Sequence, residues 1–304
     1  MLLLGISYLL LHPQFLPQLP NVFSSHGPSV GMLKRYHGIP FCNTEDAPEP
    51  VPYCYRQFEP ERPFSLFETE TELKIKQVVH DMWRNPRAYC DVLRPGMVLL
   101  KNYLTLTGQV EIVNMCQKFA REFYQPRNEE GDELGPPMMC FGRNWHPVTK
   151  YKNPYKIDGS EPPLVPYQFG LLVEKAIKDT KNYEDISLMW PDICLVNFYP
   201  NASPMGQLSL HQDCDESNHC LDEGSPVVSI SIGDSTQFMY GPNNDVHKLK
   251  DVLLESGDVL IFGGDSRLIF HRLHSILPNS APEQLLQAVG LRPGHLNLTL
   301  REIW

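Results

Sequence analysis

The hydrophobic pattern separates a featureless first part of the chain from a folded remainder. Residues 20–65 are rich in Pro, Ser and Glu and have little periodicity, so residues 1–65 are expected to form a poorly ordered extension. Apolar side chains then recur at helical spacing, which predicts helices over 71–85 and over 167–181. Another helix is predicted between them, with Thr107 as its N-cap and apolar residues at helical spacing up to Phe123. A short apolar run predicts a strand over 97–101.

From Asp192 onward the pattern changes to short apolar runs separated by turn signals such as Gly224-Ser225-Pro226 and Gly263-Gly264. Short strands at regular spacing are typical of a sandwich or barrel. When such strands form two facing sheets they make a jelly roll, whose mouth can hold a metal. The strands are expected over 193–199, 206–213, 227–233, 236–241, 252–255, 258–262, 267–273 and 295–303.

A long connection, residues 125–163, joins the second and third predicted helices. It interleaves aromatic residues with cations, among them Trp145, Lys150 and Tyr151. This combination suits a nucleic-acid base stacked on a ring and a phosphate backbone held by charge. The alternative is that the aromatic residues anchor the loop to the core, and composition alone leaves both interpretations open.

The candidate chemistry begins with His211-Gln212-Asp213 in the second predicted strand of this region. Residues two apart in a strand point to the same side, so His211 and Asp213 would present an imidazole and a carboxylate to one point. A histidine from another strand would complete the two-histidine, one-carboxylate set of non-haem Fe(II) oxygenases. His271 in SRLIFHRLHSI is the best candidate and His274 the runner-up. Residues three apart face opposite sides of a strand, so the two histidines cannot both be ligands.

Two further strands offer polar side chains on one face. Asn197 and Tyr199 share a face of their strand, and on the last strand leucines take one side while polar residues take the other. Arg301 is then an inward cation that requires an anionic partner. Beside an iron site, this arginine suggests a dicarboxylate co-substrate with one end on the metal and the other paired with arginine. The polar side of the last strand consists of His295, Asn297, Thr299 and Arg301.

These motifs follow one another in unbroken order from about residue 190 to the end of the chain. They are N-x-Y at Asn197 and Tyr199, LSLHQDCDE (208–216), PVVSISIG (226–233), GDVLIFGGDSRLIFH (257–271) and NLTLR (297–301). The series resembles the AlkB family of Fe(II)/2-oxoglutarate dioxygenases, which oxidise N-methyl groups on nucleic-acid bases and release formaldehyde. The resemblance implies an α+β fold: a double-stranded β-helix (jelly roll) at 190–304, with N-terminal packing helices and a nucleotide-recognition lid at 125–163. The domain as a whole would cover 66–304.

The resemblance also implies roles for individual residues. Fe(II) would be held by His211, Asp213 and His271. The co-substrate 2-oxoglutarate, which reacts with O2, would be held by Asn197, Tyr199, Asn297 and Arg301. Trp145, Tyr151 and Asp215 would contact the substrate.

One position departs from the family pattern R-x-N-x-T-x-R, because His295 stands where the first arginine is usual. Either His295 still contacts 2-oxoglutarate in a weakened site, or Arg292 swings in to replace the missing guanidinium. A third interpretation is a relative that binds nucleic acid without catalysis.

The resemblance is strongest to the branch linked to N6-methyladenine in DNA, so methylated DNA is the expected partner. Methylated RNA, such as 1-methyladenine in tRNA, stays open, as does an oxygenase acting on protein or small molecules. The net charge of −10 excludes a binder that relies on bulk positive charge. We expect a monomer without membrane association, in the nucleus and cytoplasm; the apolar residues 1–20 are a weak candidate for organelle targeting.

Overall fold

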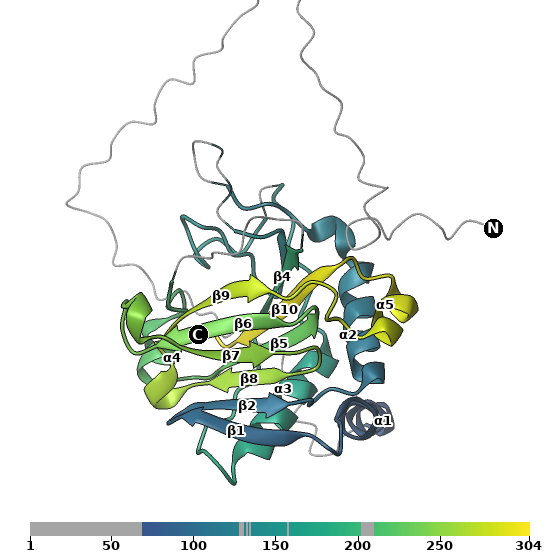
Figure 1. Ribbon diagram of the computed structural model, residues 1–304. Helices are drawn as coiled ribbons and strands as arrows, with labels where there is room; N and C mark the ends of the chain where they lie inside the picture. The colour runs from purple at the N-terminus through teal and green to yellow at the C-terminus, as the bar shows by residue number, and fades with distance from the viewer. Residues whose placement is uncertain (1–68, 128–130, 132, 134, 157, 202–209) are drawn as a thin grey trace, which may run out of the picture. The chain divides into compact units, whose positions relative to one another are not determined.

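Two antiparallel sheets form the centre of the part of the chain that the computed structural model describes, residues 69–304 without 128–130, 132, 134, 157 and 202–209 (Figure 1). The larger sheet has the order β1 (Tyr89–Arg94), β2 (Met97–Lys101), β8 (Val259–Phe262), β5 (Val227–Gly233), β10 (Gly294–Arg301), β4 (Ile193–Pro200), β3 (Met138–Phe141). The smaller has the order β7 (Lys250–Leu254), β6 (Thr236–Gly241), β9 (Phe270–Ile276). The prediction for residues 1–65 lies outside the described residues.

Helices cover the outer face of the larger sheet. Leu296, Leu298 and Leu300 of β10 are fully buried in one core with residues of α2 (Leu106–Lys118), α3 (Tyr167–Thr180) and α5 (Glu283–Val289). Burying a leucine side chain is worth about 1.5–3 kcal/mol. A one-residue slip of β10 would turn all three leucines away from the helices, so the apolar pattern fixes which face looks inward. The described helices also include α1 (Glu70–Val78) and α4 (Asn218–Asp222).

The space between the two sheets is apolar in one part and polar in the other. The apolar part joins Met97, Leu99 and Phe262 of the larger sheet to Phe238 and Tyr240 of the smaller one. The polar part lies against the face of β10 that is opposite its leucines. The apolar part holds the two sheets together.

At one end of the strand pair β5 and β10, beside this polar part, the backbones of Gly233 and Gly294 approach each other closely. Gly233 has φ +97°, and a Cβ there would lie 2.5 Å from the Gly294 carbonyl oxygen. The Asp234 amide donates to that same oxygen at 2.7 Å. Only glycine adopts the backbone conformation of Gly233 without strain. Gly233 pairs with His295 in the register of β5 and β10. The carbonyl of the next residue, Asp234, therefore lies next to His295.

The jelly roll and the helices before it are confirmed, and several element boundaries are corrected. The second helix is capped by Thr105 rather than Thr107: the Thr105 hydroxyl accepts a hydrogen bond from the Gly108 amide at 3.1 Å. The strand predicted over 267–273 begins at Phe270, because residues Gly264–Ser266 form a 3-10 turn. The described helices are each too short or too polar to span a bilayer.

The strand predicted over 206–213 falls partly on 202–209, which lie outside the described residues. Residues 210–213 form no regular strand, and His211 pairs with β9 through a single bridge to His271. The strands β1 and β3 and the short helices α4 and α5 were not predicted. The sequence of β1, YCDVLR, does not alternate, and β3 is only four residues long within the 125–163 connection.

Candidate active site

His211, Asp213 and His271 converge on one point between the sheets. One ligand atom from each lies within 4.8 Å of the others. Backbone hydrogen bonds in both directions, 3.1 and 2.9 Å long, join His211 to His271 and hold their ring centroids 4.5 Å apart. The His271 Nε2 atom lies 3.8 Å from an Asp213 carboxylate oxygen. The three groups could hold one metal ion and leave its other positions open.

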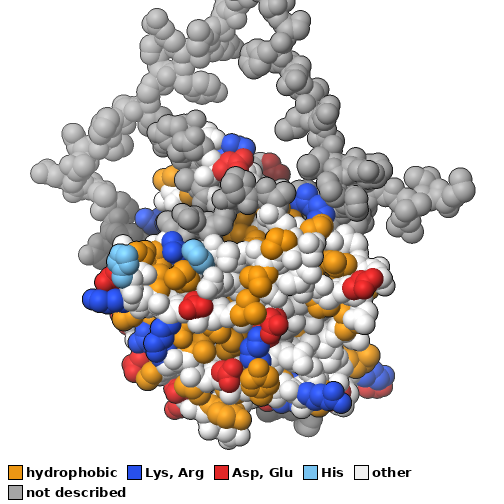
Figure 2. Space-filling view, in the orientation of Figure 1, with side chains coloured by type: hydrophobic (Ala, Val, Ile, Leu, Met, Phe, Trp, Pro, Cys, Tyr) orange, Lys and Arg blue, Asp and Glu red, His pale blue; other side chains and the backbone are white. Residues whose placement is uncertain are grey.

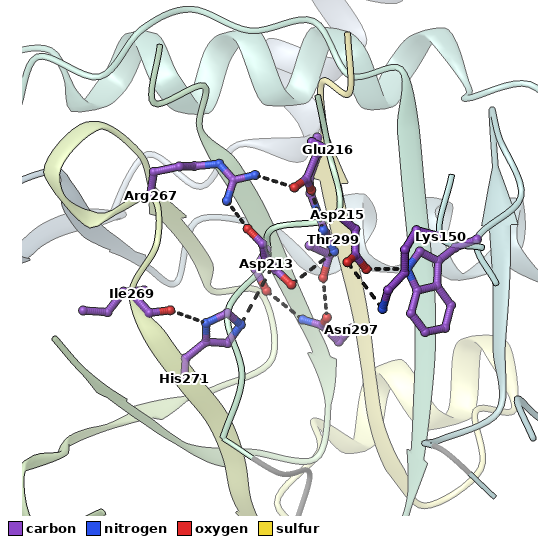
Figure 3. A network of polar contacts seen from close by, with 12 residues as sticks. Lys150, Asp213, Asp215, Glu216, Arg267, Ile269, His271, Asn297 and Thr299 are labelled. Carbon is purple, nitrogen blue, oxygen red and sulfur yellow. Dashed lines mark hydrogen bonds and ion pairs between the residues drawn. The ribbon is translucent and has the colours of Figure 1, made fainter. Parts of the chain in front are cut away.

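The surroundings of His271 set the orientation of its ring (Figure 3). Its Nδ1 lies 3.1 Å from the Ile269 carbonyl oxygen. Because a carbonyl only accepts, Nδ1 carries the hydrogen and Nε2 is left free for a metal. The Phe238 ring stacks on the imidazole with centroids 5.5 Å apart. Burial lowers the pKa of His271 to about 4, although the Asp213 carboxylate opposes the shift, so the ring is neutral at about pH 7.

The Asp213 carboxylate is held in its charged form. Burial acts to raise its pKa, but the positive charge of Arg301, with a smaller contribution from Arg267, lowers the pKa to about 2. The Arg301 Nη2 atom lies 3.4 Å from Asp213 Oδ1. An ionised carboxylate and a neutral imidazole are the protonation states that a metal ion requires of its ligands.

A buried carboxylate lies between two arginines next to the metal-ligating groups, and Figure 3 shows its contact with one of them, Arg267. The Glu216 side chain is fully buried; one of its oxygens lies 2.6 Å from Arg301 Nη1 and the other 2.9 Å from Arg267 Nη2. Arg267 also donates to the Asp213 carbonyl oxygen. Sequence reasoning assigned no role to Glu216 or Arg267. The available signal was Arg267 itself, a cation within the apolar run SRLIF.

The position of Arg301 corrects one expectation. The sequence suggested that Arg301 pairs with the end of a dicarboxylate distant from the metal. In the structure Arg301 contacts Asp213 and Glu216, so it lies at the metal end of the site. From there the polar face of β10 runs away from Asp213 through Thr299 and Asn297 to His295.

This face carries buried polar side chains, some of which are incompletely paired. Asn297 donates to the Ser229 hydroxyl at 2.7 Å and accepts from Thr299 at 2.9 Å. In register, Asn297 pairs with Asn197. The buried atoms His295 Nε2 and Ser231 Oγ near this face have no hydrogen-bond partner among the described residues. Buried polar atoms without partners are costly in a finished core, so the face fits a polar ligand such as 2-oxoglutarate.

Tyr199 and His295 are directly paired across β4 and β10, with ring centroids 6.1 Å apart. Both predicted co-substrate residues are therefore on the inward face. Arg292 is not: its guanidinium lies 5.0 Å from the centroid of Phe198, and Phe198 packs in the core on the helix side of the sheet. The alternative in which Arg292 replaces the missing arginine is not supported by this geometry.

His274 lies outside the cluster of possible metal ligands among the described residues. A bulge in the pairing of β6 with β9, between Leu273 and Ser275, interrupts the alternation there. The two histidines therefore lie on a less regular strand than the sequence suggested, and His271 alone joins the cluster.

In the 125–163 connection, Trp145 forms a cluster with Asp215 and Lys150. The indole N–H donates to Asp215 Oδ2 at 2.8 Å, and Lys150 Nζ lies 3.4 Å from the other carboxylate oxygen. The same ammonium lies 5.2 Å from the centroid of the indole ring. The structure thus brings two predicted substrate residues together, although they are 70 positions apart in the chain.

Tyr151 is different from the other predicted substrate residues. It is 4% exposed and packs in an apolar cluster with Met138, Cys140 and Leu195. A ring buried in this way cannot stack on a base, so the interpretation of Tyr151 as a substrate contact is corrected. The composition of the loop does not tell whether the Tyr151 side chain points into the core or towards the solvent.

A jelly roll with two histidines and a carboxylate between its sheets has the architecture of a non-haem iron oxygenase. Residues 96–301 match the 2OG-Fe(II) oxygenase superfamily. The chain is 51% identical over 224 residues to the DNA N(6)-methyladenine demethylase ALKBH1D of Arabidopsis thaliana, covering 69% of this chain and 50% of that protein. It is 39% identical to the Escherichia coli alpha-ketoglutarate-dependent dioxygenase AlkB, covering 64% of this chain and 88% of that protein.

Two further comparisons extend this picture. The tRNA demethylase abh1 of Schizosaccharomyces pombe is 36% identical, covering 78% of this chain and 83% of that protein. The solved structure of OsALKBH1 has a TM-score of 0.66 and 44% identity, covering 70% of this chain and 100% of that one. The chain therefore belongs to the AlkB family within the 2OG-Fe(II) oxygenase superfamily, whose cofactor is Fe(II) and whose co-substrates are 2-oxoglutarate and O2. It spans about half the length of the first curated relatives that it matches.

Proposed function

We propose that this chain is an Fe(II)- and 2-oxoglutarate-dependent dioxygenase that removes methyl groups from N-methylated bases in nucleic acid, with N6-methyladenine in DNA as its preferred substrate. The observation that carries the proposal is the convergence of ligand atoms of His211, Asp213 and His271 within 4.8 Å of one another, beside a strand face with buried polar atoms that the described residues leave unpaired. The Arabidopsis relative named as a DNA N(6)-methyladenine demethylase supports the choice of base.

His211, Asp213 and His271 would hold Fe(II), with His271 ligating through Nε2. Asn197, Tyr199, His295 and Asn297 would line the site of 2-oxoglutarate. When bound, iron and 2-oxoglutarate supply the oxidation: O2 and 2-oxoglutarate become succinate and CO2 while the methyl carbon gains a hydroxyl group, and the hydroxymethyl group leaves as formaldehyde. Arg301 would keep Asp213 ionised, and Glu216 would balance the charge of Arg301.

The cluster of Trp145, Lys150 and Asp215 is the candidate contact with the base. An indole ring offers a stacking surface, and a carboxylate can accept a hydrogen bond from an exocyclic amine. A base in a duplex must first be flipped out, at a cost of a few kcal/mol, and stacking would offset part of that cost. On the face drawn in Figure 2, cationic and acidic side chains are interspersed, so backbone contacts would come from local cations such as the exposed Lys152.

Methylated RNA is the second candidate substrate. The tRNA demethylase abh1 resembles this chain over a larger share of both proteins than the Arabidopsis relative does. The chemistry at the metal would be the same, and the choice between the two depends on contacts to the sugar and the flanking nucleotides.

A succinate assay over a panel of methylated DNA and RNA oligonucleotides tests the proposal. We expect succinate formation to be stimulated most by DNA containing N6-methyladenine, and to be abolished by Asp213→Ala. Stronger stimulation by methylated RNA would favour the second candidate. Turnover that no nucleic acid stimulates would indicate a protein or small-molecule oxygenase, and oligonucleotide binding without turnover would indicate a non-catalytic binder.

A further inference from the structure

His295 is a buried imidazole with one nitrogen paired and the other unpaired. The side chain is fully buried, its Nδ1 lies 2.8 Å from the Asp234 carbonyl oxygen, and its Nε2 has no hydrogen-bond partner within the described part of the chain. Because the close backbone approach of Gly233 and Gly294 fixes the Asp234 carbonyl, the ring is held in one orientation.

This pairing determines which protons the ring carries. A carbonyl oxygen can only accept, so His295 Nδ1 carries a hydrogen in every protonation state that keeps the bond. In the neutral ring Nε2 is then a bare acceptor. A carboxylate also only accepts, so a neutral His295 has nothing to donate to it. The ring can bind a carboxylate only after Nε2 gains a proton.

His295 lies on the part of the inward face of β10 that is distant from the candidate metal ligands, where the second carboxylate of 2-oxoglutarate would bind. Along the inward face of β10, Arg301 contacts the candidate metal ligand Asp213, and the face continues away from it through Asn297 to His295. If the 2-oxo acid end of 2-oxoglutarate occupies the metal site, its other carboxylate would lie along this face, which leads to His295 and its cross-strand partner Tyr199.

We propose that His295 takes up a proton at Nε2 from the solvent when the far carboxylate of 2-oxoglutarate binds, so that co-substrate binding is coupled to proton uptake. The proposal rests on the proposed use of 2-oxoglutarate by this chain. The imidazole becomes an imidazolium that donates from Nδ1 to Asp234 and from Nε2 to the ligand. The proton comes from the buffer, and no bond within the co-substrate changes.

The ionisable groups around the ring are compatible with this change. The Asp234 carboxylate lies on the β5–β6 turn, accepts from the Ser280 and Ala281 amides, and has one buried oxygen without a partner; its negative charge favours an imidazolium. From β4, Tyr199 has a phenol whose pKa is raised by burial, so it stays protonated. On the facing sheet, His274 of β9 is not among the groups that shift the pKa of His295. Arg292 lies on the opposite face of β10.

The free state of the ring supports the same conclusion. Burial lowers the pKa of His295 to about 4, against the opposing effect of the Asp234 carbonyl and carboxylate. At about pH 7 the free ring is therefore neutral, and the proton must be acquired on binding. By linkage, affinity for the ligand falls by up to about tenfold for each pH unit between the free and the bound pKa of such a group.

Calorimetry of 2-oxoglutarate binding to the full chain loaded anaerobically with Fe(II) measures this coupling directly. Titrations in phosphate and in Tris, whose ionisation enthalpies differ, give the net number of protons taken up. We expect an uptake approaching one proton per 2-oxoglutarate at about pH 7. Pyruvate, which has the 2-oxo acid end but no second carboxylate, is expected to bind with much smaller uptake.

Variants separate His295 from its neighbours. His295→Arg and His295→Gln both supply a donor that needs no proton, so binding to either is expected to lose the uptake and the fall in affinity with rising pH. His274→Gln is the matched control and should behave as the wild type. Binding of 2-oxoglutarate with no proton uptake, or an uptake that persists in both His295 variants, would overturn the inference while leaving the proposed function intact. A wild-type chain that binds pyruvate and 2-oxoglutarate equally weakly would instead count against the proposed function.

Discussion

At the scale of single residues, the site depends on buried charges that compensate one another. Glu216 is enclosed between Arg267 and Arg301, and each arginine also contacts Asp213. Removing one member of a buried ionic group leaves an uncompensated charge, which costs more than the intact group contributes.

We predict that Glu216→Gln destabilises the protein by about 3–5 kcal/mol. Equilibrium unfolding in urea measures the change. Glu223→Gln, which removes an exposed carboxylate nearby, is the control and should change stability by less than about 0.5 kcal/mol. Equal effects of the two substitutions would show that Glu216 is not the compensating charge.

His295 gives a second prediction, on acid stability. Its pKa is about 4 in the folded protein and about 6.5 in an unfolded chain. Protons therefore bind the unfolded state first, and the folded state loses stability as the pH falls from about 6.5 towards about 4. Above that range His295 makes no pH-dependent contribution.

We expect His295→Gln to remove roughly 3 kcal/mol of the acid destabilisation of the metal-free protein across this range. Urea unfolding at a series of pH values provides the comparison. Parallel stability curves for the variant and the wild type would mean that His295 is already charged in the folded state.

The sequence predicted the residues of the site more completely than it predicted which side chains contact them. The inward face of β10 follows from alternation within a strand, which is a local property. The same argument paired His211 with Asp213, although residues 210–213 form no regular strand and the two side chains converge with His271 through the bridge to β9. Three contacts could not be predicted because they join segments that are distant in the chain. They are the ion pair of Arg301 with Glu216, the hydrogen bond of Trp145 with Asp215, and the packing of Tyr151 in the core. Alternation gives the face on which a side chain lies, but it does not give the residue that meets it there.

At the scale of elements, the residue that caps the N-terminus of α2 determines where this helix begins. The predicted N-cap Thr107 and the observed N-cap Thr105 are two positions apart, and both are candidates by residue type. Thr105 has extended backbone angles and accepts from the Gly108 amide, whereas Thr107 is an exposed residue within the helix.

Thr105→Ala is therefore predicted to cost about 1 kcal/mol of stability, the usual value of a lost N-cap. Thr107→Ala should be neutral or slightly stabilising, because alanine is the better helix former. Thermal unfolding of the two variants decides the matter. A larger loss with Thr107→Ala would restore the boundary predicted from the sequence.

The cluster around Trp145 carries the prediction for the 125–163 connection. We predict that Trp145→Ala weakens binding of methylated oligonucleotide by roughly 1–3 kcal/mol, the value of one stacked base, with a smaller effect on thermal stability. Trp145→Phe is the matched control, because it keeps an aromatic face but loses the N–H that donates to Asp215.

Fluorescence anisotropy with a labelled oligonucleotide and thermal unfolding measure the two effects side by side. If Trp145→Phe retains most of the affinity, stacking is the main contribution; if it is as weak as Trp145→Ala, the bond to Asp215 is what matters. A large loss of stability with unchanged affinity would make Trp145 a structural anchor of the loop.

At the scale of the whole molecule, the sequence predicted the class of fold because short apolar strands with regular turns leave few alternatives. The strands over 227–233 and 236–241 were predicted with the bounds that the structure gives them. The short edge elements β1 and β3 and the helices α4 and α5 were missed, because each is too short for its periodicity to be distinguished from a loop.

The arrangement of the two sheets explains why the site lies where it does. The helices occupy one face of the larger sheet, and the apolar cluster around Phe238 and Phe262 holds the sheets together. The polar side chains of the site come from β4, β9 and β10 and from residues 211–216. Charged and unpaired polar groups are stable there only because they face one another or a ligand.

The central claim is that the three converging groups hold a metal that couples oxidation of 2-oxoglutarate to loss of a methyl group. A single-turnover reaction under isotopically labelled O2, with Fe(II), 2-oxoglutarate and DNA containing N6-methyladenine, tests it most directly. Mass spectrometry should find one labelled succinate and one formaldehyde for each methyl group lost, and neither product with Asp213→Ala. Methyl loss without labelled succinate, or full activity of Asp213→Ala, would contradict the account.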